Sequence, residues 1–139
     1  MIIDATDLIL GRLATFVAKK ALLGEKFDIV NCEKAVITGD RNKIIEKYFG
    51  KIRKGIPLKG PYFPRMPDRF VRRTIRGMLP YKRERGKMAF GNIMCYVGVP
   101  DEFKDKKLET VKEANVSKVP NLKYICVGEI SKVLGAKLK

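Results

Sequence analysis

The chain alternates short apolar runs with segments in which apolar residues recur at helical spacing. The clearest helical segment is 10–23, where Gly24 follows apolar positions three and four residues apart: Leu10, Leu13, Ala14, Val17, Ala18 and Ala21. Strand-like apolar runs lie at 2–5, 27–32, 34–38, 93–99 and 124–127. Further helices are expected at 41–52, 68–79, 101–114 and 129–134. This order predicts an α/β fold in which helices cover a mostly parallel sheet.

The length and the apolar content predict one domain spanning 1–139. The chain has 139 residues, of which 45% are hydrophobic, so it can bury a sizeable core. Cys32, Cys95 and Cys126 lie in apolar runs and form no C-x-x-C pair. We expect them to pack in the core as small hydrophobic side chains.

The positive charge is concentrated in the central third of the chain. Residues 41–87 contain 16 basic and three acidic side chains, a net charge of +13, out of +15 for the whole chain. Such a region predicts a polyanionic partner, most often nucleic acid. A membrane surface is the competing anion, but the sequence has no apolar run of about 18 residues and no basic start typical of a secretory signal. We therefore expect a soluble, cytoplasmic protein without a membrane partner.

Residues 51–67, KIRKGIPLKGPYFPRMP, have a composition that opposes regular structure. Four prolines, two glycines and five basic residues occur there. Proline removes a backbone donor and blocks helices and central strands. We predict an extended, irregular, basic arm at 51–67. Its aromatic residues, Tyr62 and Phe63, either stack on bases or sugars or attach the arm to the core.

The segment DRFVRRTIRGMLP (68–80) predicts a helix with two contrasting faces. Asp68 is the expected N-cap, and Pro80 ends the helix. On a helical wheel, four arginines share one side, and Val71, Ile75, Met78 and Leu79 lie opposite. Like charges at this spacing cost about 0.2–0.5 kcal/mol a pair, on the order of 1–2 kcal/mol in all. The uniform sign favours an external polyanion over a solvated face.

Signatures of catalysis are weak. The chain contains no histidine, no phosphate-binding glycine loop and no dinucleotide-binding fingerprint. Thr38-Gly39-Asp40 is best explained as a turn with a helix cap, and Asp4 and Asp7 as a strand-end turn in which Asp7 caps the next helix. We expect no enzyme, no catalytic residue, no metal site, no cofactor and no small-molecule substrate. A nucleotide-dependent enzyme or nuclease on an α/β core remains the alternative from another class.

Charge alone does not separate DNA from RNA, but an irregular arm suits folded RNA better than a uniform groove. Arginine binds two phosphate oxygens through its planar fork. The candidate RNA-binding residues are the basic and aromatic side chains of the arm, the helix and the stretch after it: Lys51, Arg53, Lys54, Lys59, Tyr62, Arg65, Arg69, Arg72, Arg73, Arg76, Lys82, Arg83, Arg85 and Lys87.

Three blocks in order resemble a known family. RRTIRGMLP (72–80) followed by RGKMAFGNIMCYVG (85–98) is similar to the signature block of the universal large-subunit ribosomal protein L13 family. IIDATDLILGRLATFVAKKAL (2–22) resembles its opening strand and first helix, and IVNCEKAVITGDRNKI (29–44) resembles its next element. Bacterial members carry an N-terminal extension and a His-containing segment after Y-x-G. This sequence continues with VGVPDEFKDKKLETV (97–111), so the archaeal type is expected.

The resemblance implies a three-layer α/β/α fold with a short, mostly parallel four-stranded sheet. It also implies a structural protein of the large ribosomal subunit that binds ribosomal RNA early in assembly, next to other large-subunit proteins. The family's RNA-contacting block falls on Arg72, Arg73, Arg76 and the basic residues after Pro80. The alternative is a regulatory RNA-binding protein that acts off the ribosome.

Overall fold

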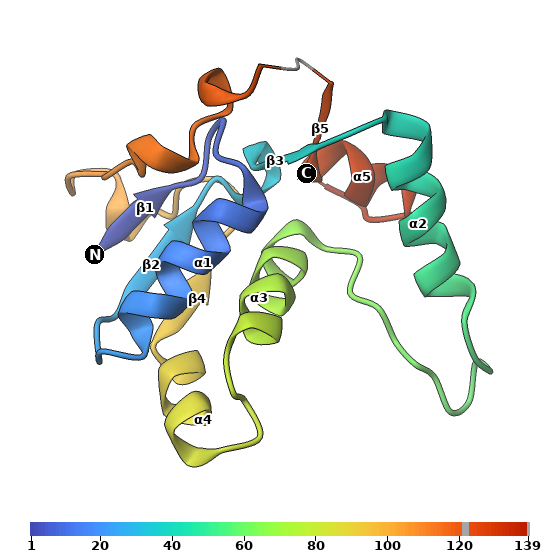
Figure 1. The fold of residues 1–139 in the computed structure, drawn as a ribbon, viewed down its shortest axis with the longest axis horizontal. Coiled ribbons are helices and arrows are strands. Elements are labelled where there is room, and N and C mark those ends of the chain that lie inside the picture. Colours follow the sequence, from blue (N-terminus) through green and yellow to red (C-terminus); the bar gives the residue numbers. More distant parts are fainter. Residues whose placement is uncertain (121–122, 139) are drawn as a thin grey trace.

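The computed structural model describes residues 1–120 and 123–138 and confirms a mixed α/β fold (Figure 1). Three short strands, β1 (Ile2–Asp4), β2 (Phe27–Val30) and β4 (Ile93–Cys95), form a parallel sheet in the order β1–β2–β4. In its register, Ile29 lies between Ile3 and Cys95. At the outer edge of β1, Glu109 makes a further parallel bridge with Ile3.

The described strands correct the expectation of one four-stranded sheet. β3 (Val36–Thr38) pairs antiparallel with β5 (Tyr124–Cys126), away from the parallel strands. The cause is local, because Asn31 adopts a left-handed conformation and a 3₁₀ turn follows at Cys32–Lys34. This turn redirects the chain before β3 begins. The three-layer arrangement implied by the resemblance stays a prediction.

Five helices accompany the strands in the described chain: α1 (Leu10–Ala21), α2 (Arg41–Arg53), α3 (Pro67–Met78), α4 (Glu84–Gly91) and α5 (Val127–Val133). Helix α4 was not expected, since basic residues dominate the start of its sequence. The prediction of a helix at 101–114 is wrong. Two single 3₁₀ turns, Asp101–Phe103 and Lys112–Ala114, occur there instead. Backbone groups of this segment bond outward to the first strand and its following loop, as in Asp4 N to Glu109 O (2.9 Å) and Ile9 N to Ala114 O (2.7 Å).

Of the expected helix caps, only Asp40 is confirmed. Its side chain accepts hydrogen bonds from Asn42 N (2.9 Å) and Lys43 N (3.3 Å) at the start of α2. The N-cap of α3 is Met66 and that of α1 is Ile9, and neither uses a side chain. The predictions that Asp68 and Asp7 cap these helices are therefore wrong. Helix α3 starts one residue earlier because Pro67 already has the backbone angle that a first helical turn needs.

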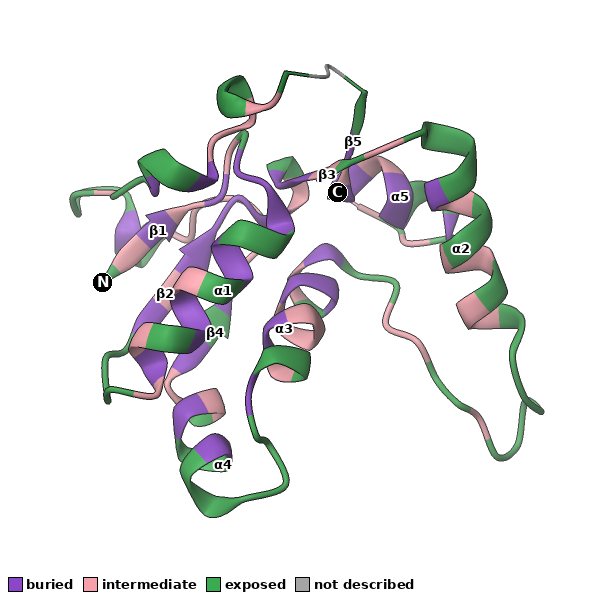
Figure 2. Ribbon diagram, viewed as in Figure 1, coloured by how far each residue is buried: buried purple, intermediate pink, exposed green. Residues whose placement is uncertain are grey.

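The core lies where α1 and α3 meet and where both contact the sheet (Figures 1 and 2). Leu13 and Val17 of α1 and Val71 and Ile75 of α3 are fully buried. The central strand contributes Phe27 and Ile29, with neighbours Ile3 and Ile93. Cys32 and Cys95 are buried free thiols, as expected, whereas Cys126 is only half-buried.

The connection from α3 to α4 is held by a close backbone approach at Gly86. A Cβ atom at this position would lie 2.1 Å from the carbonyl oxygen of Pro80. Because that neighbour is backbone, it moves only if the whole connection moves. In the same helix, a Cβ at Gly91 would have no atom within 4 Å outside its own helix.

We therefore predict that Gly86→Ala lowers the free energy of unfolding by about 1–3 kcal/mol, the usual cost of overpacking. The matched variant Gly91→Ala should change it by no more than about 1 kcal/mol, and in the stabilising direction, because alanine favours helix more than glycine does. Urea denaturation measures both values. Equal effects of the two substitutions would contradict this explanation.

Candidate nucleic-acid interface

Helix α3 has the two faces that its sequence predicts. Phe70, Val71 and Ile75 are buried. Met78, expected on the apolar face, is 42% exposed, and Thr15 Oγ1 lies 3.4 Å from its sulfur. The opposite face carries the arginine cluster, defined as Arg69, Arg72, Arg73 and Arg76. These four side chains, with Pro64 and Phe90, line a hollow of about 200 Å³.

Aromatic rings hold three of the four guanidinium groups in place. Arg72 lies 4.5 Å from the ring centre of Phe90 and Arg76 lies 5.1 Å from that of Tyr81. Arg73 lies 5.0 Å from Phe63 and donates a hydrogen bond to the carbonyl oxygen of Tyr62 (2.8 Å). A cation over a ring face is attracted by about 0.5–1 kcal/mol at exposed sites. The rings restrict the side chains without neutralising their charge.

Within 1–120 and 123–138, no ion pair engages any of the predicted cationic residues. The ion pairs there join Lys20 to Glu25, Arg41 to Glu129 and Lys104 to Asp101. The buried Nε of Arg72 finds no hydrogen-bond partner in this part of the chain. The cluster therefore carries uncompensated charge, and the remaining guanidinium N–H groups are donors that can bind an anion.

The sequence left two roles open for the aromatic residues of the arm, attachment to the core or stacking on a partner. Each of the two residues fits one of these roles. Phe63 contacts Phe70 and Tyr48, with ring centres 5.6 and 5.7 Å apart, and Tyr48 contacts Phe70 at 4.8 Å. Phe63 thus attaches the arm, and Tyr48 attaches α2, to the buried side of α3. Tyr62 is 69% exposed. Its ring is therefore open to a partner.

The arm is shorter than its composition suggested. Helix α2 continues through Lys51 to Arg53, and α3 begins at Pro67, so the irregular part spans 54–66. The prolines explain this, because the first of them, Pro57, lies beyond the end of α2 and does not oppose its last turn. Lys51 consequently projects from a helix.

A second hollow of about 190 Å³ lies where α2, the arm and α3 meet, lined by Lys51, Lys54, Pro61, Tyr62, Phe63 and Arg73. Burial lowers the pKa of Lys51, and the nearby positive charges of Lys47, Arg73 and Lys54 lower it further. Crowded cations without an acid among them favour a bound anion.

The remaining predicted residues are less closely gathered. Lys59, Lys82, Arg83 and Lys87 are exposed. Arg53 lies over the ring of Phe49, with 5.5 Å to its centre. Two arginines of the predicted set also contact other parts of the chain. Arg85 donates to the carbonyl oxygen of Leu22 (3.4 Å), and a Cβ at Gly135 would lie 3.4 Å from Arg65.

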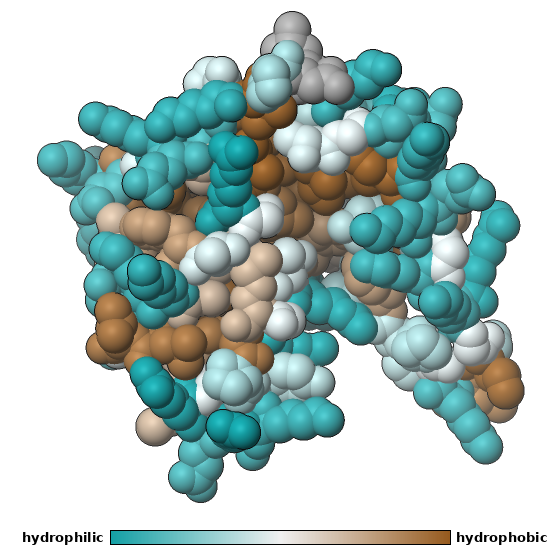
Figure 3. Space-filling model, in the orientation of Figure 1, coloured by the Kyte–Doolittle hydropathy of each residue, from teal (hydrophilic) through white to brown (hydrophobic). Residues whose placement is uncertain are grey.

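Two lysines of the interface were missing from the predicted set. Lys43 and Lys47 share a helix face with Lys51 and Lys54 and line with them a hollow of about 520 Å³. Their spacing, at positions 43, 47, 51 and 54, is the signal that was available in the sequence. Hydrophilic side chains cover the part of the surface over α2, and the surface is hollowed between the arm and the rest of the molecule (Figure 3).

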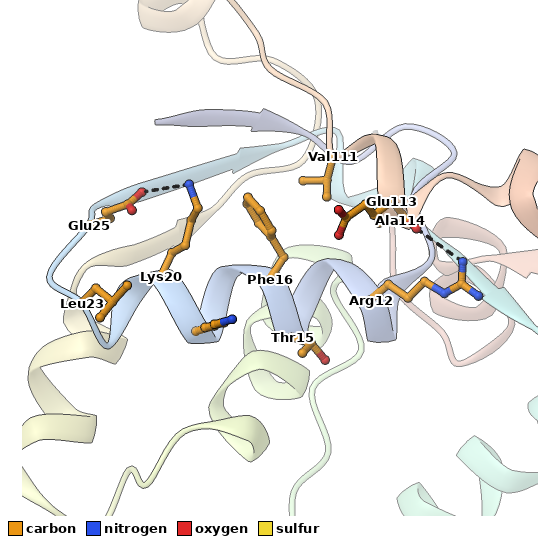
Figure 4. Close-up of a pocket in the computed structure, with 10 residues that line it drawn as sticks. Arg12, Thr15, Phe16, Lys20, Leu23, Glu25, Val111, Glu113 and Ala114 are labelled. Atoms are coloured by element: carbon orange, nitrogen blue, oxygen red, sulfur yellow. Dashed lines mark hydrogen bonds and ion pairs between the residues drawn. The ribbon is translucent and has the colours of Figure 1, made fainter.

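Another hollow differs from these in the charge of its lining. One of about 630 Å³ lies between α1 and residues 111–114 (Figure 4). Its apolar lining includes Phe16 and Leu23, and its rim mixes both signs, with Lys20 paired to Glu25. This balance of charge sets it apart from the basic surface on α2, the arm and α3.

Asp4, one of the carboxylates that an enzyme would need, holds a turn instead. Asp4 Oδ1 accepts hydrogen bonds from Thr6 N (3.0 Å), Thr6 Oγ1 (2.7 Å) and Asn31 Nδ2 (3.0 Å). Burial alone would raise the pKa of Asp4, but these bonds lower it below its usual value. In the described chain, no three Cys, Asp or Glu side chains are grouped to hold a metal ion, and no helix is long and apolar enough to cross a bilayer.

Comparison with known proteins gives a consistent result. The family model "Ribosomal protein L13" matches residues 1–102. A "Large ribosomal subunit protein uL13" of Methanosarcina barkeri is 50% identical over 98% of both chains, and one of Methanococcoides burtonii is 48% identical over 98% of both. The Haloarcula marismortui protein of the same name is 43% identical over 98% of this chain and 91% of its own.

The crowding of cations around Lys51 predicts a measurable change in its pKa when one of them is removed. Replacing Arg73 by Gln should raise the pKa of Lys51 part of the way towards its usual 10.5, because one repelling charge is lost while burial remains. Heteronuclear NMR of the lysine side chains measures this pKa. Arg85→Gln is the control, because Arg85 points towards Leu22 and should leave the pKa of Lys51 unchanged. If the pKa of Lys51 does not change in Arg73→Gln, the crowding of positive charge around Lys51 is contradicted.

Proposed function

This chain belongs to the ribosomal protein L13 family, and from that premise we propose that it binds large-subunit ribosomal RNA through its basic central region, 41–87, and supports early assembly of the subunit. Family membership also confirms that the chain is a large-subunit ribosomal protein of the cytoplasm and not an enzyme. The relatives named above are archaeal.

The arginine cluster is the observation that carries the RNA-binding proposal. Four cations on one face of α3 cost on the order of 1–2 kcal/mol through repulsion. Ring contacts with Phe63, Tyr81 and Phe90 position three of them, and no ion pair within the described residues neutralises them. A polyphosphate backbone supplies the missing negative charge, and each guanidinium can bind two phosphate oxygens.

The contact surface extends over the arm and α2. Phosphate contacts position a protein on RNA without reading its sequence, so we assign the lysines and arginines mainly to positioning. The proposed RNA-binding set comprises the predicted residues together with the two lysines of α2: Lys43, Lys47, Lys51, Arg53, Lys54, Lys59, Tyr62, Arg65, Arg69, Arg72, Arg73, Arg76, Lys82, Arg83, Arg85 and Lys87. Neighbouring ribosomal proteins are the proposed second class of partner, since charge on the remaining surface is nearly balanced.

Replacing Arg69, Arg72, Arg73 and Arg76 together by Gln should weaken binding to large-subunit RNA fragments and flatten its salt dependence. If each arginine meets one phosphate, the slope of log K against log salt becomes less negative by about 3. Stability should change little, because the relief of repulsion offsets the loss of ring contacts. Filter binding at several salt concentrations measures the affinity, and urea denaturation measures the stability.

The matched control removes the same charge elsewhere. Lys19, Lys107, Lys112 and Lys118 are exposed and lie outside the basic central region. Their replacement by Gln should reduce the salt slope far less than the loss of the arginine cluster does. Equal effects of the two quadruple variants would show that only net charge matters and would overturn the proposed interface.

The native protein should also co-sediment with large ribosomal subunits after a moderate salt wash. The quadruple arginine variant should be depleted from these particles relative to the lysine control. Recovery of the native protein only in fractions free of subunits would instead indicate an RNA-binding role off the ribosome.

A further inference from the structure

The loop at the end of the arm is closed on itself. Ile56 N donates to Gly60 O (3.3 Å), and Gly60 N donates to Ile56 O (2.8 Å). At Gly55, with φ of +87°, a Cβ atom would lie 1.9 Å from the carbonyl oxygen of Gly60. Only glycine allows this approach, because a side chain would clash with backbone. The loop therefore has a defined shape of its own.

Tyr62 is anchored to this loop while its ring stays exposed. Its hydroxyl donates to the carbonyl oxygen of Pro57 (2.8 Å), and its own carbonyl accepts the hydrogen bond from Arg73 (2.8 Å). The residue is nevertheless 69% exposed. Since Phe63 already attaches the arm to the core, packing does not explain why a second aromatic ring is held here.

Three cations line the hollow that the Tyr62 ring borders. Lys51, Lys54 and Arg73 line the hollow of about 190 Å³ together with Tyr62. Lys51 and Arg73 are themselves held against Phe63, at 5.6 and 5.0 Å from its ring centre. One exposed ring and three cations, two of them held against Phe63, provide a stacking surface and a phosphate site in one small hollow.

This combination fits one class of ligand. Every base has a flat face that can stack on an aromatic ring, and every nucleotide carries a phosphate. In a duplex both faces of a base are covered by its neighbours, so only an unstacked base can use such a ring. We propose that this hollow binds a single unstacked RNA nucleotide, with its base against Tyr62 and its phosphate among Lys51, Lys54 and Arg73.

The proposal rests on the RNA-binding function and names the RNA element that the protein recognises. Two features in or near this hollow support it. Leu58, in the neighbouring closed loop, is 90% exposed, and some nucleic-acid-binding proteins insert apolar side chains such as leucine between bases and unstack them. Burial lowers the pKa of Lys51, and the positive charges of Lys47, Arg73 and Lys54 lower it further, a crowding that a phosphate would relieve.

The test compares single-stranded with duplex RNA on the full chain. An octamer of uridylate is the single-stranded probe, and a blunt RNA duplex with the same number of phosphates is the reference, both at one salt concentration. Tyr62→Leu should weaken binding of the octamer by about 5- to 150-fold, the effect of losing one base–aromatic stack. Duplex binding should change less than about twofold. The salt slope should stay constant, because no charge is removed.

Two variants serve as controls. Tyr62→Phe keeps the ring and should retain most of the octamer affinity, although it loses the hydrogen bond to Pro57. Tyr124→Leu removes another exposed tyrosine, in β5, and should leave the octamer affinity unchanged. An octamer with 5-iodouridine should crosslink to Tyr62 on irradiation, and mass spectrometry would identify the residue.

The outcomes separate this proposal from the general function. If Tyr62→Leu binds the octamer as tightly as the native chain, or loses octamer and duplex equally, the nucleotide site is wrong. Ribosomal RNA binding would still stand if the quadruple arginine variant lost affinity. If Tyr62→Leu impairs only incorporation into particles, with octamer affinity intact, the loop meets a protein and the nucleotide site is again overturned.

Discussion

The packing of one face of α3 against α1 and the sheet is the interaction on which the proposed interface depends. Fully burying a side chain such as Phe70, Val71 or Ile75 is favourable by about 1.5–3 kcal/mol. Together these three exceed the repulsion among the four arginines of the opposite face, which is on the order of 1–2 kcal/mol. The core can therefore hold a helix whose outer surface carries one sign of charge.

Aromatic residues connect that core to the interface. Phe70, on the buried face of α3, contacts Tyr48 of α2 and Phe63 of the arm, so α2 and the arm converge on one ring of α3. Phe63 in turn lies under Arg73, while Phe90 of α4 lies under Arg72. Positioning of this kind reduces the entropy that the long side chains lose on binding, which otherwise opposes association.

The sequence predicted the parts that depend on local periodicity. Helices α1, α2 and α3 and the two faces of α3 follow from apolar spacing, and the Asp40 cap follows from side-chain chemistry. The predictions that failed concern segments whose conformation depends on contacts with distant parts of the backbone or on a neighbouring proline. Residues 101–114 bond to the first strand and its following loop and do not form a helix. Asp68 stands in the first turn of α3 because Pro67 already starts the helix.

The concentration of positive charge in 41–87, and the amphipathic helix that carries part of it, follow from residue order alone. Which of these residues act together depends on contacts between distant segments. Tertiary contacts place Lys51 beside Arg73 and direct Arg85 towards Leu22, and they pack Phe63 against the core while Tyr62 stays exposed. Burial of Phe70 brings together neighbours from α2, the arm and α3, and no local pattern encodes that contact.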